Sequence, residues 1–248
     1  MSYHILNGDC LATQLAKTSL AGERIICREC MIEGPLSVII DERFWFRRAD
    51  FIGLAYDETK EGYNDKVRDE FSKLISLPKD VEVNLWFEDD LFCQANMWLI
   101  LHLLHQKGHR GNVYRVFPIM SEGKDHWQGF APSNSQLLEQ AFDNKVLMRA
   151  IDIALGSDLW QAYANHEMCE LMELAHTSSN AFNCLPEVCQ AHIDRFADPN
   201  RPEQAMREII GEGFNSFKTA FAEFTKRQGI YGFGDLQVQG IYYEIVED

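Results

Sequence analysis

One apolar segment, interrupted by three consecutive acids, most strongly restricts how this chain can fold. Residues 81–104 have the sequence VEVNLWFEDDLFCQANMWLILHLL. Val81–Phe87 is predicted to form a strand, and Leu91–Lys107 a helix that is apolar nearly all round. Such elements are typical of the centre of an α/β domain, where both faces of the sheet are covered. The acids of residues 88–90 are therefore expected at the seam between two buried elements.

The first half of the chain alternates predicted strands with predicted helices. The strands are residues 3–6, 24–30, 81–87 and 112–118, and residues 41–56 and 64–77 are helices between the second and third strands. This alternation predicts an α/β fold with a doubly wound, mostly parallel sheet and helices on both of its faces. The usual strand order for such a sheet is 2-1-3-4, which makes the first and third strands neighbours. We assign residues 1–130 to this α/β domain.

Residues 131–248 are predicted to form a mainly helical domain. The expected helices are residues 135–155, 157–176, 186–197, 202–210 and 214–227. The final segment, GIYGFGDLQVQGIYYEIVED, is punctuated by glycines and ends in β-branched and aromatic residues, which favours a β-hairpin. Helices followed by a hairpin resemble a winged-helix arrangement.

The charge balance restricts the partners of the protein. The 248 residues carry 38 acids against 23 Lys and Arg, a formal net charge of −15. Such a chain repels phosphate backbones, so nucleic acid is not an expected partner. Residues 201–248 alone carry five basic and eight acidic side chains, which argues against a DNA-contacting winged helix.

The location of the protein is predicted from its thiols and its apolar segments. Seven scattered cysteines fit a reducing compartment better than a disulfide framework. No secretory leader and no run long enough to span a membrane is visible in the sequence. We expect a cytoplasmic protein of bacterial type with no membrane contact.

Polar turns after three of the predicted strands suggest a ligand site. Ligands of open α/β sheets bind beyond the carboxyl ends of the strands, and Asn7-Gly8-Asp9, Glu33-Gly34-Pro35 and Glu88-Asp89-Asp90 all follow strands. With the strand order 2-1-3-4, Asp9, Glu88 and Asp90 would face one crevice.

Carboxylates that face one crevice repel each other, so such a cluster is stable only with a metal, a cationic partner or a raised pKa. A Mg²⁺ ion held by Asp9, Glu88 and Asp90 together with substrate phosphates is one expectation. Arg28 would hold an anion or pair with an acid. The alternative is structural: Asp9 and Asp90 cap the helices that follow them.

The same turns resemble an uncharacterised bacterial family, a domain of unknown function. Its members carry similar G-D, R-(D/E)-x-x-x-E-G-P and W-F-E-x-D-L-x-x-Q motifs, here in LNGDC, RECMIEGP and LWFEDDLFCQ. The resemblance covers roughly residues 3–120 and carries no activity. It picks out Gly8, Asp9, Arg28, Glu29, Glu33, Gly34, Pro35, Trp86, Glu88, Asp90 and Gln94, and it leaves Asp89 out. Of these, the expected ligand-binding residues are Gly8, Asp9, Arg28, Glu29, Glu33, Glu88, Asp90 and Gln94.

Weaker patterns point elsewhere. Glu88-x-Asp90 with Asp9 is similar to the acids that hold Mg²⁺ in Toprim phosphotransfer domains. The C-x-x-C of Cys27 and Cys30 is expected to be structural, because no second pair of zinc ligands has matching spacing. The helix face with His166, Glu170, Glu173 and His176 is more typical of an exposed helix than of a metal site.

Two functions follow as hypotheses. In the first, the protein binds a small phosphorylated or nucleotide ligand at the strand ends and supports metal-assisted hydrolysis or phosphotransfer. In the second, it is a non-catalytic regulatory or interaction protein whose helical half binds another protein. The acids then only cap helices and form ion pairs.

Overall fold

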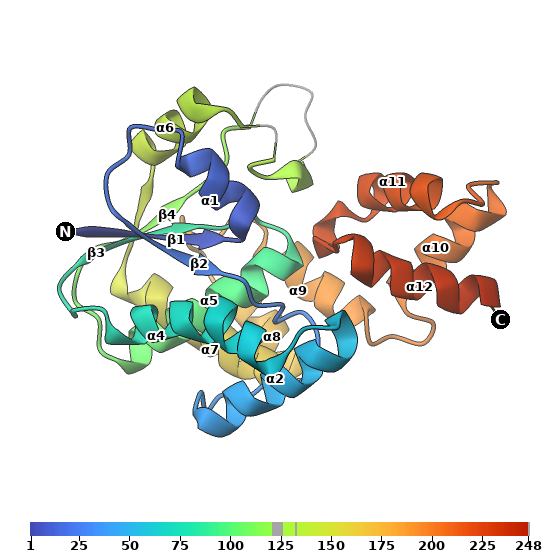
Figure 1. Ribbon diagram of the computed structural model, residues 1–248, viewed down its shortest axis with the longest axis horizontal. Coiled ribbons are helices and arrows are strands. Elements are labelled where there is room, and N and C mark those ends of the chain that lie inside the picture. Colours follow the sequence, from blue (N-terminus) through green and yellow to red (C-terminus); the bar gives the residue numbers. More distant parts are fainter. Residues whose placement is uncertain (121–125, 132, 248) are drawn as a thin grey trace.

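The protein is built around one mixed sheet covered by helices on both faces (Figure 1). The computed structural model describes residues 1–120, 126–131 and 133–247. The sheet order is β2-β1-β3-β4-β5, which confirms the predicted order of the first four strands. These four are parallel, and β5 is added antiparallel to β4. The strands are β1 (Ser2–Asn7), β2 (Glu23–Cys27), β3 (Glu82–Trp86), β4 (Val113–Val116) and β5 (Val146–Met148).

Two layers of helices cover the sheet (Figure 1). One face carries α1 (Asp9–Leu15) and α6 (Ser135–Asp143), whose leucines pack around Trp86. The opposite face carries the larger core. Its helices are α2 (Glu42–Tyr56), α3 (Lys60–Tyr63), the π-helical turn η1 (Asn64–Arg68), α4 (Asp69–Ser76), α5 (Leu91–Gln106), α7 (Ala150–Ala164), α8 (Met168–Ala175) and α9 (Leu185–Asp194). None of the helices described is both long and apolar enough to cross a membrane.

The central position expected for the third strand and its helix is confirmed. β3 lies between β1 and β4, and nearly every residue of α5 is buried. The helix packs closely on α7, because Gly156 lets Leu101 approach: a Cβ at residue 156 would lie 2.3 Å from Leu101 Cδ1. The acids of residues 88–90 therefore lie at the carboxyl end of the central strand.

The second half of the chain differs from its predicted pattern at three places. The helix expected over residues 157–176 is divided, because α7 ends at Ala164 and α8 begins at Met168. The helix expected over residues 135–155 is divided by β5, which pairs with β4 and forms the edge of the sheet. The Asp152 carboxylate then accepts the Arg149 backbone N–H at 2.7 Å and starts α7. β5 and α7 follow residue 130 in the chain, yet they complete the sheet and its larger core. The domain boundary at residue 130 therefore stays a prediction.

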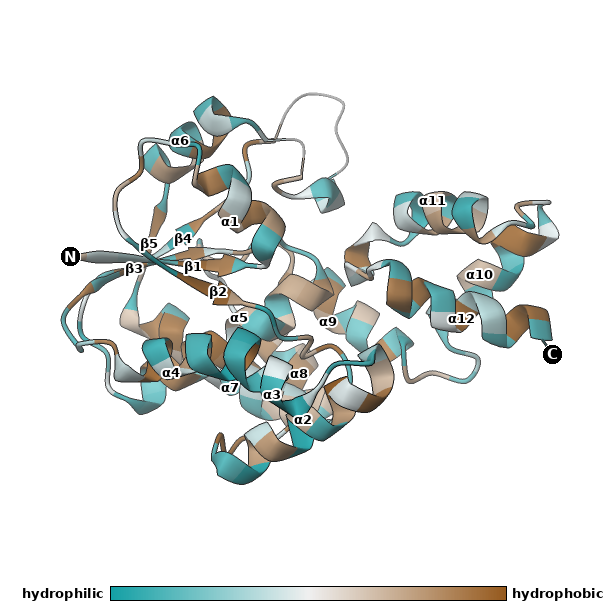
Figure 2. Ribbon diagram, viewed as in Figure 1, coloured by the Kyte–Doolittle hydropathy of each residue, from teal (hydrophilic) through white to brown (hydrophobic). Residues whose placement is uncertain are grey.

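The predicted C-terminal hairpin is wrong. Residues 235–247 form α12 (Asp235–Glu247), which packs with α10 (Arg201–Gly211) and α11 (Phe217–Arg227) around a small core of their own. Val238 and Tyr242 are buried, with Ile241 and Ile245 beside them, and this spacing is helical. Packing of that face outweighs the β propensity of the aromatic and β-branched residues. Figure 2 shows the banded hydropathy of these helices.

A buried ion pair fixes the loop after β2. The Glu29 and Arg48 side chains are both fully buried and pair with each other. Tyr63 donates its hydroxyl to Glu29, and the Arg48 guanidinium also donates to the Cys30 carbonyl at 2.9 Å. These partners hold residues 29–33 against α2.

Removing one charge of this pair should destabilise the protein strongly. Arg48→Met leaves the Glu29 carboxylate buried without its counter-charge, and we expect the free energy of unfolding to fall by about 3–5 kcal/mol in urea titrations. The exposed neighbour in Arg47→Met serves as the control, with an expected change within about 0.5 kcal/mol. Equal effects of the two substitutions would show that the pair does not hold the loop.

Candidate functional site

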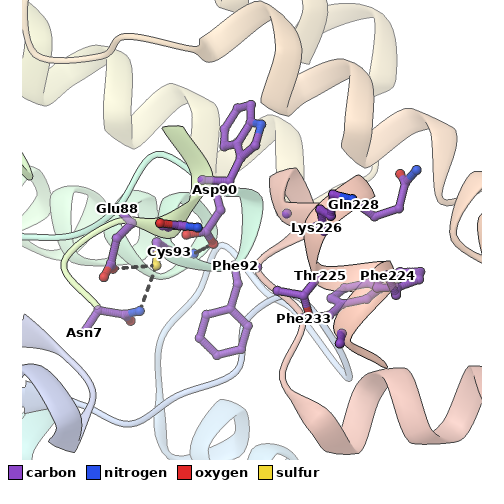
Figure 3. A pocket seen from close by; sticks show the side chains of 15 residues that line it. Asn7, Glu88, Asp90, Phe92, Cys93, Phe224, Thr225, Lys226, Gln228 and Phe233 are labelled. Carbon is purple, nitrogen blue, oxygen red and sulfur yellow. Dashed lines mark hydrogen bonds between the residues drawn. The ribbon is translucent and has the colours of Figure 1, made fainter. Parts of the chain in front are cut away.

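A cleft of about 710 Å³ lies where β1 and β3 end. Asn7, Glu88, Asp90 and Cys93 line one side, and eight residues between Ala222 and Phe233 line the other (Figure 3). The first side belongs to the sheet and the start of α5. The second belongs to the end of α11 and the segment before α12, which includes the 3₁₀ turn η3 (Gly229–Tyr231). The cleft thus lies at the switch point of the doubly wound sheet, where ligands of this fold class bind.

Glu88 and Asp90 converge on one thiol. The Cys93 thiol donates to Glu88 Oε2 at 3.0 Å and accepts from Asn7 Nδ2 at 2.9 Å. Asp90 Oδ1 accepts the Cys93 backbone N–H at 2.9 Å, which makes Asp90 the cap of α5. Ligand atoms of Glu88, Asp90 and Cys93 all lie within 4.8 Å of one another. The predicted cap by Asp90 is confirmed, and the same carboxyl also faces Glu88. The predicted cap by Asp9 is wrong, because Gly8 is the N-cap residue of α1 and no side chain caps that helix.

Burial and repulsion keep this cluster from carrying its full negative charge. Burial raises the pKa of Asp90 to about 7, and the neighbouring Glu88 carboxylate adds to the effect. Burial, followed by the charges of Asp90 and Glu88, raises the pKa of the Cys93 thiol well above its ordinary value. The thiol is therefore a hydrogen-bond donor between two acids rather than a thiolate nucleophile.

Buried amides hold the cluster in place. Asn96 donates to Asn7 Oδ1 at 3.0 Å and to the Glu29 carbonyl at 2.7 Å, and it accepts the Met31 backbone N–H at 3.0 Å. Gln94 donates to the Glu88 carbonyl at 2.8 Å. Gln94, a predicted ligand-binding residue, thus fixes the backbone beside the cleft.

Asp9 stands apart from the other two predicted metal ligands. Its carboxylate pairs with Arg28, with Nε–Oδ2 at 2.9 Å, and Arg28 also donates to the Lys66 carbonyl at 2.7 Å. Gly8, Asp9 and Arg28 line a smaller cavity of about 300 Å³ that shares Asn7 and Phe92 with the main cleft. The crevice at the strand ends is present. The three-acid cluster is not, because Arg28 binds Asp9.

Glu29 and Glu33 shape the loop after β2. Glu29 is buried and forms an ion pair with Arg48, and Glu33 accepts a hydrogen bond from the Tyr56 hydroxyl at 2.6 Å. The ring of Phe51 occupies the space that a Cβ at Gly34 would fill, and Gly34 has a φ of +79°. The E-G-P turn therefore needs glycine at this position for both backbone conformation and space.

The other predicted constellations form no metal-ligand group among the residues described. Cys27 and Cys30 are both buried, and burial raises the pKa of each thiol to about 12, which argues against a redox pair. No three of His166, Glu170, Glu173 and His176 place their ligand atoms within 4.8 Å of one another.

Sequence reasoning missed the far wall of the cleft and the thiol at its centre. The sequence could have indicated that Cys93 lies near the acids, since it comes three residues after the cap Asp90. The sequence gives no such indication for the residues of the far wall, because only the packing of the C-terminal helices brings them opposite the strand ends. These residues include Phe224, Thr225, Lys226 and Phe233.

Comparison of the chain with protein-family models, with curated proteins and with solved structures gave no match in any of the three. The resemblance to the uncharacterised bacterial family accordingly stays a prediction.

The acid cluster should make the stability of the unliganded protein depend on pH. A carboxyl whose pKa rises from 3.8 to about 7 on folding stabilises the protein fully below the lower value and loses this contribution as the pH rises through the higher one. Asp90→Asn keeps a capping side chain and removes the buried charge. Its stability relative to wild type should therefore increase by a few kcal/mol between pH 5 and pH 8, at about 1.4 kcal/mol per pKa unit, in urea unfolding. An unchanged difference at the two pH values would contradict this assignment.

Proposed function

We propose that the protein binds a small phosphorylated ligand of the nucleotide class in the strand-end cleft, with a Mg²⁺ ion on Glu88 and Asp90. The observation that carries the proposal is the pair of carboxylates, held close together at the switch point of the sheet on the wall of a 710 Å³ cleft. Two carboxylates at such short range repel each other, and a divalent cation between them would remove this repulsion.

The donor set suits Mg²⁺. This ion binds proteins through one or two carboxylates and completes its shell with water and substrate phosphates. Glu88 and Asp90 supply the carboxylates, and the protonated Cys93 supplies no hard ligand. Asp9, the third ligand expected from sequence, is held by Arg28 instead.

The opposite wall suits the remainder of a nucleotide. Thr225, Lys226 and Gln228 offer polar groups to phosphate oxygens, and the Lys226 side chain is 75% exposed beside Glu223. Phe92, Trp127 and Phe233 line the same cleft and offer rings on which a base can stack. A ligand that spans the cleft would thus contact both the sheet and the C-terminal helices. Metal-assisted hydrolysis or phosphotransfer is the chemistry that an ion at this position supports.

The alternative function, a regulatory or interaction protein, stays a prediction. The observation that bears on it is a row of exposed apolar side chains on α12, namely Leu236, Tyr243 and Val246. Sedimentation of the purified chain over a range of concentrations would show whether this face joins two copies. A monomer at every concentration would exclude that form of the alternative.

Ligand binding should be visible as thermal stabilisation. A ligand at about 100 times its Kd stabilises the native state by about 2.7 kcal/mol, and each kcal/mol raises the Tm by roughly 2–4 °C for a chain of this size. We expect such a shift with at least one nucleoside di- or triphosphate and MgCl₂ together. The same nucleotide with a chelator should give a much smaller one.

Matched variants locate the ion. Glu88→Gln should abolish the magnesium-dependent part of the shift, while Asp9→Asn should keep it, because Asp9 lies in the neighbouring cavity. A shift that survives Glu88→Gln, or that Asp9→Asn abolishes, would place the ligand elsewhere.

A further inference from the structure

A second group of ligand-type side chains lies beside the acid cluster. Asp89 follows β3, His126 begins the 3₁₀ turn η2 (His126–Gln128), and Cys184 directly precedes α9. Ligand atoms of these three residues all lie within 4.8 Å of one another. His126 Nε2 is 3.3 Å from Asp89 Oδ2 and 3.1 Å from Cys184 Sγ. Residues from three distant parts of the chain thus meet at one point.

The distances match the edges of a tetrahedral metal site. An ion bound at about 2.0 Å by nitrogen or oxygen and about 2.3 Å by sulfur sets neighbouring ligand atoms roughly 3.3–3.6 Å apart. The separation of His126 Nε2 from Asp89 Oδ2, 3.3 Å, lies in this range, and that from Cys184 Sγ, 3.1 Å, is a few tenths of an ångström shorter than the range. A catalytic triad is a poorer description, because one nitrogen, Nε2, faces both the thiol and the carboxylate. A triad histidine uses a different nitrogen for each partner.

The surroundings position Asp89 as a ligand. Its other oxygen, Oδ1, accepts from Arg115 Nη2 at 3.1 Å, and Asn183 Nδ2 lies 3.3 Å from Oδ2. Carboxylate ligands of metals are typically held by such hydrogen bonds from outside the coordination shell. Asp89 is 7% exposed, while the His126 side chain is 36% exposed. The carboxylate is fixed, and solvent reaches the site from the side of η2.

We propose that Asp89, His126 and Cys184 bind one Zn²⁺ ion, with water in the fourth position. Nitrogen, sulfur and carboxylate oxygen are together the ligand set of zinc rather than of magnesium. On binding, the Cys184 thiol releases its proton to solvent and the thiolate coordinates the ion. This site is separate from the proposed magnesium site, and neither proposal depends on the other.

Cobalt titration of the purified chain tests the proposal. After treatment with a chelator, the protein is titrated with CoCl₂, which reports a thiolate ligand by a near-ultraviolet charge-transfer band and a tetrahedral site by visible bands. We expect both bands to saturate at one equivalent of cobalt and to disappear when ZnCl₂ is added.

Four variants separate this site from the other thiols. Cys184→Ser should remove the charge-transfer band, and His126→Gln should weaken cobalt binding at least tenfold. Cys93→Ser, in the neighbouring acid cluster, and Cys169→Ser, an exposed thiol, should leave both bands unchanged. Should Cys184→Ser fail to fold, His126→Gln gives the same decision. Absence of the bands in wild type, or their persistence in both ligand variants, would overturn the proposal.

Discussion

The pairing of β1 with β3 is the constraint on which the rest of the molecule depends. The two strands are parallel and in register from Ser2 with Glu82 to Leu6 with Trp86. Their carboxyl ends therefore lie side by side, and Asn7 comes within hydrogen-bonding distance of Cys93 in the first turn of α5. Since the chain leaves β1 and β3 at a switch point of the sheet, a cleft opens at these ends. The C-terminal helices then close it from the other side (Figure 1).

The acids after β3 divide between two faces of one turn. Glu88 and Asp90 face the cleft and share Cys93, while Asp89 points toward Arg115 and His126. Burial of Asp90 next to Glu88 costs folding free energy, and an unliganded protein keeps such an arrangement only if the surrounding packing is strong enough to hold it. The largely buried α5 and the buried Glu29 and Arg48 pair provide that packing. The surrounding packing thus compensates for the repulsion between Glu88 and Asp90, which a bound cation would reduce.

The sequence predicts the central part of this fold because its signals there are local. The apolar runs of β3 and α5 fix a buried strand and helix, and the common topology of doubly wound sheets gives the strand order. The sequence allows Arg28 to pair with an acid but does not predict which one, because the choice of Asp9 depends on the reach of Arg28 across the end of β1. The helix α12 is missed because its β-branched and aromatic residues favour a strand locally, while contacts with α10 and α11 decide the outcome. The meeting of Asp89 with His126 and Cys184 is likewise set by long-range packing alone.

The most direct test of the proposed ligand site is to locate a divalent ion in it. Crystals of the protein grown with a nucleotide and MnCl₂ in place of magnesium would show the ion by anomalous scattering. We expect a peak between the carboxylates of Glu88 and Asp90, with nucleotide phosphate oxygens beside it on the side of Lys226. A peak at Asp9, or bound nucleotide with no ion at Glu88 and Asp90, would contradict it.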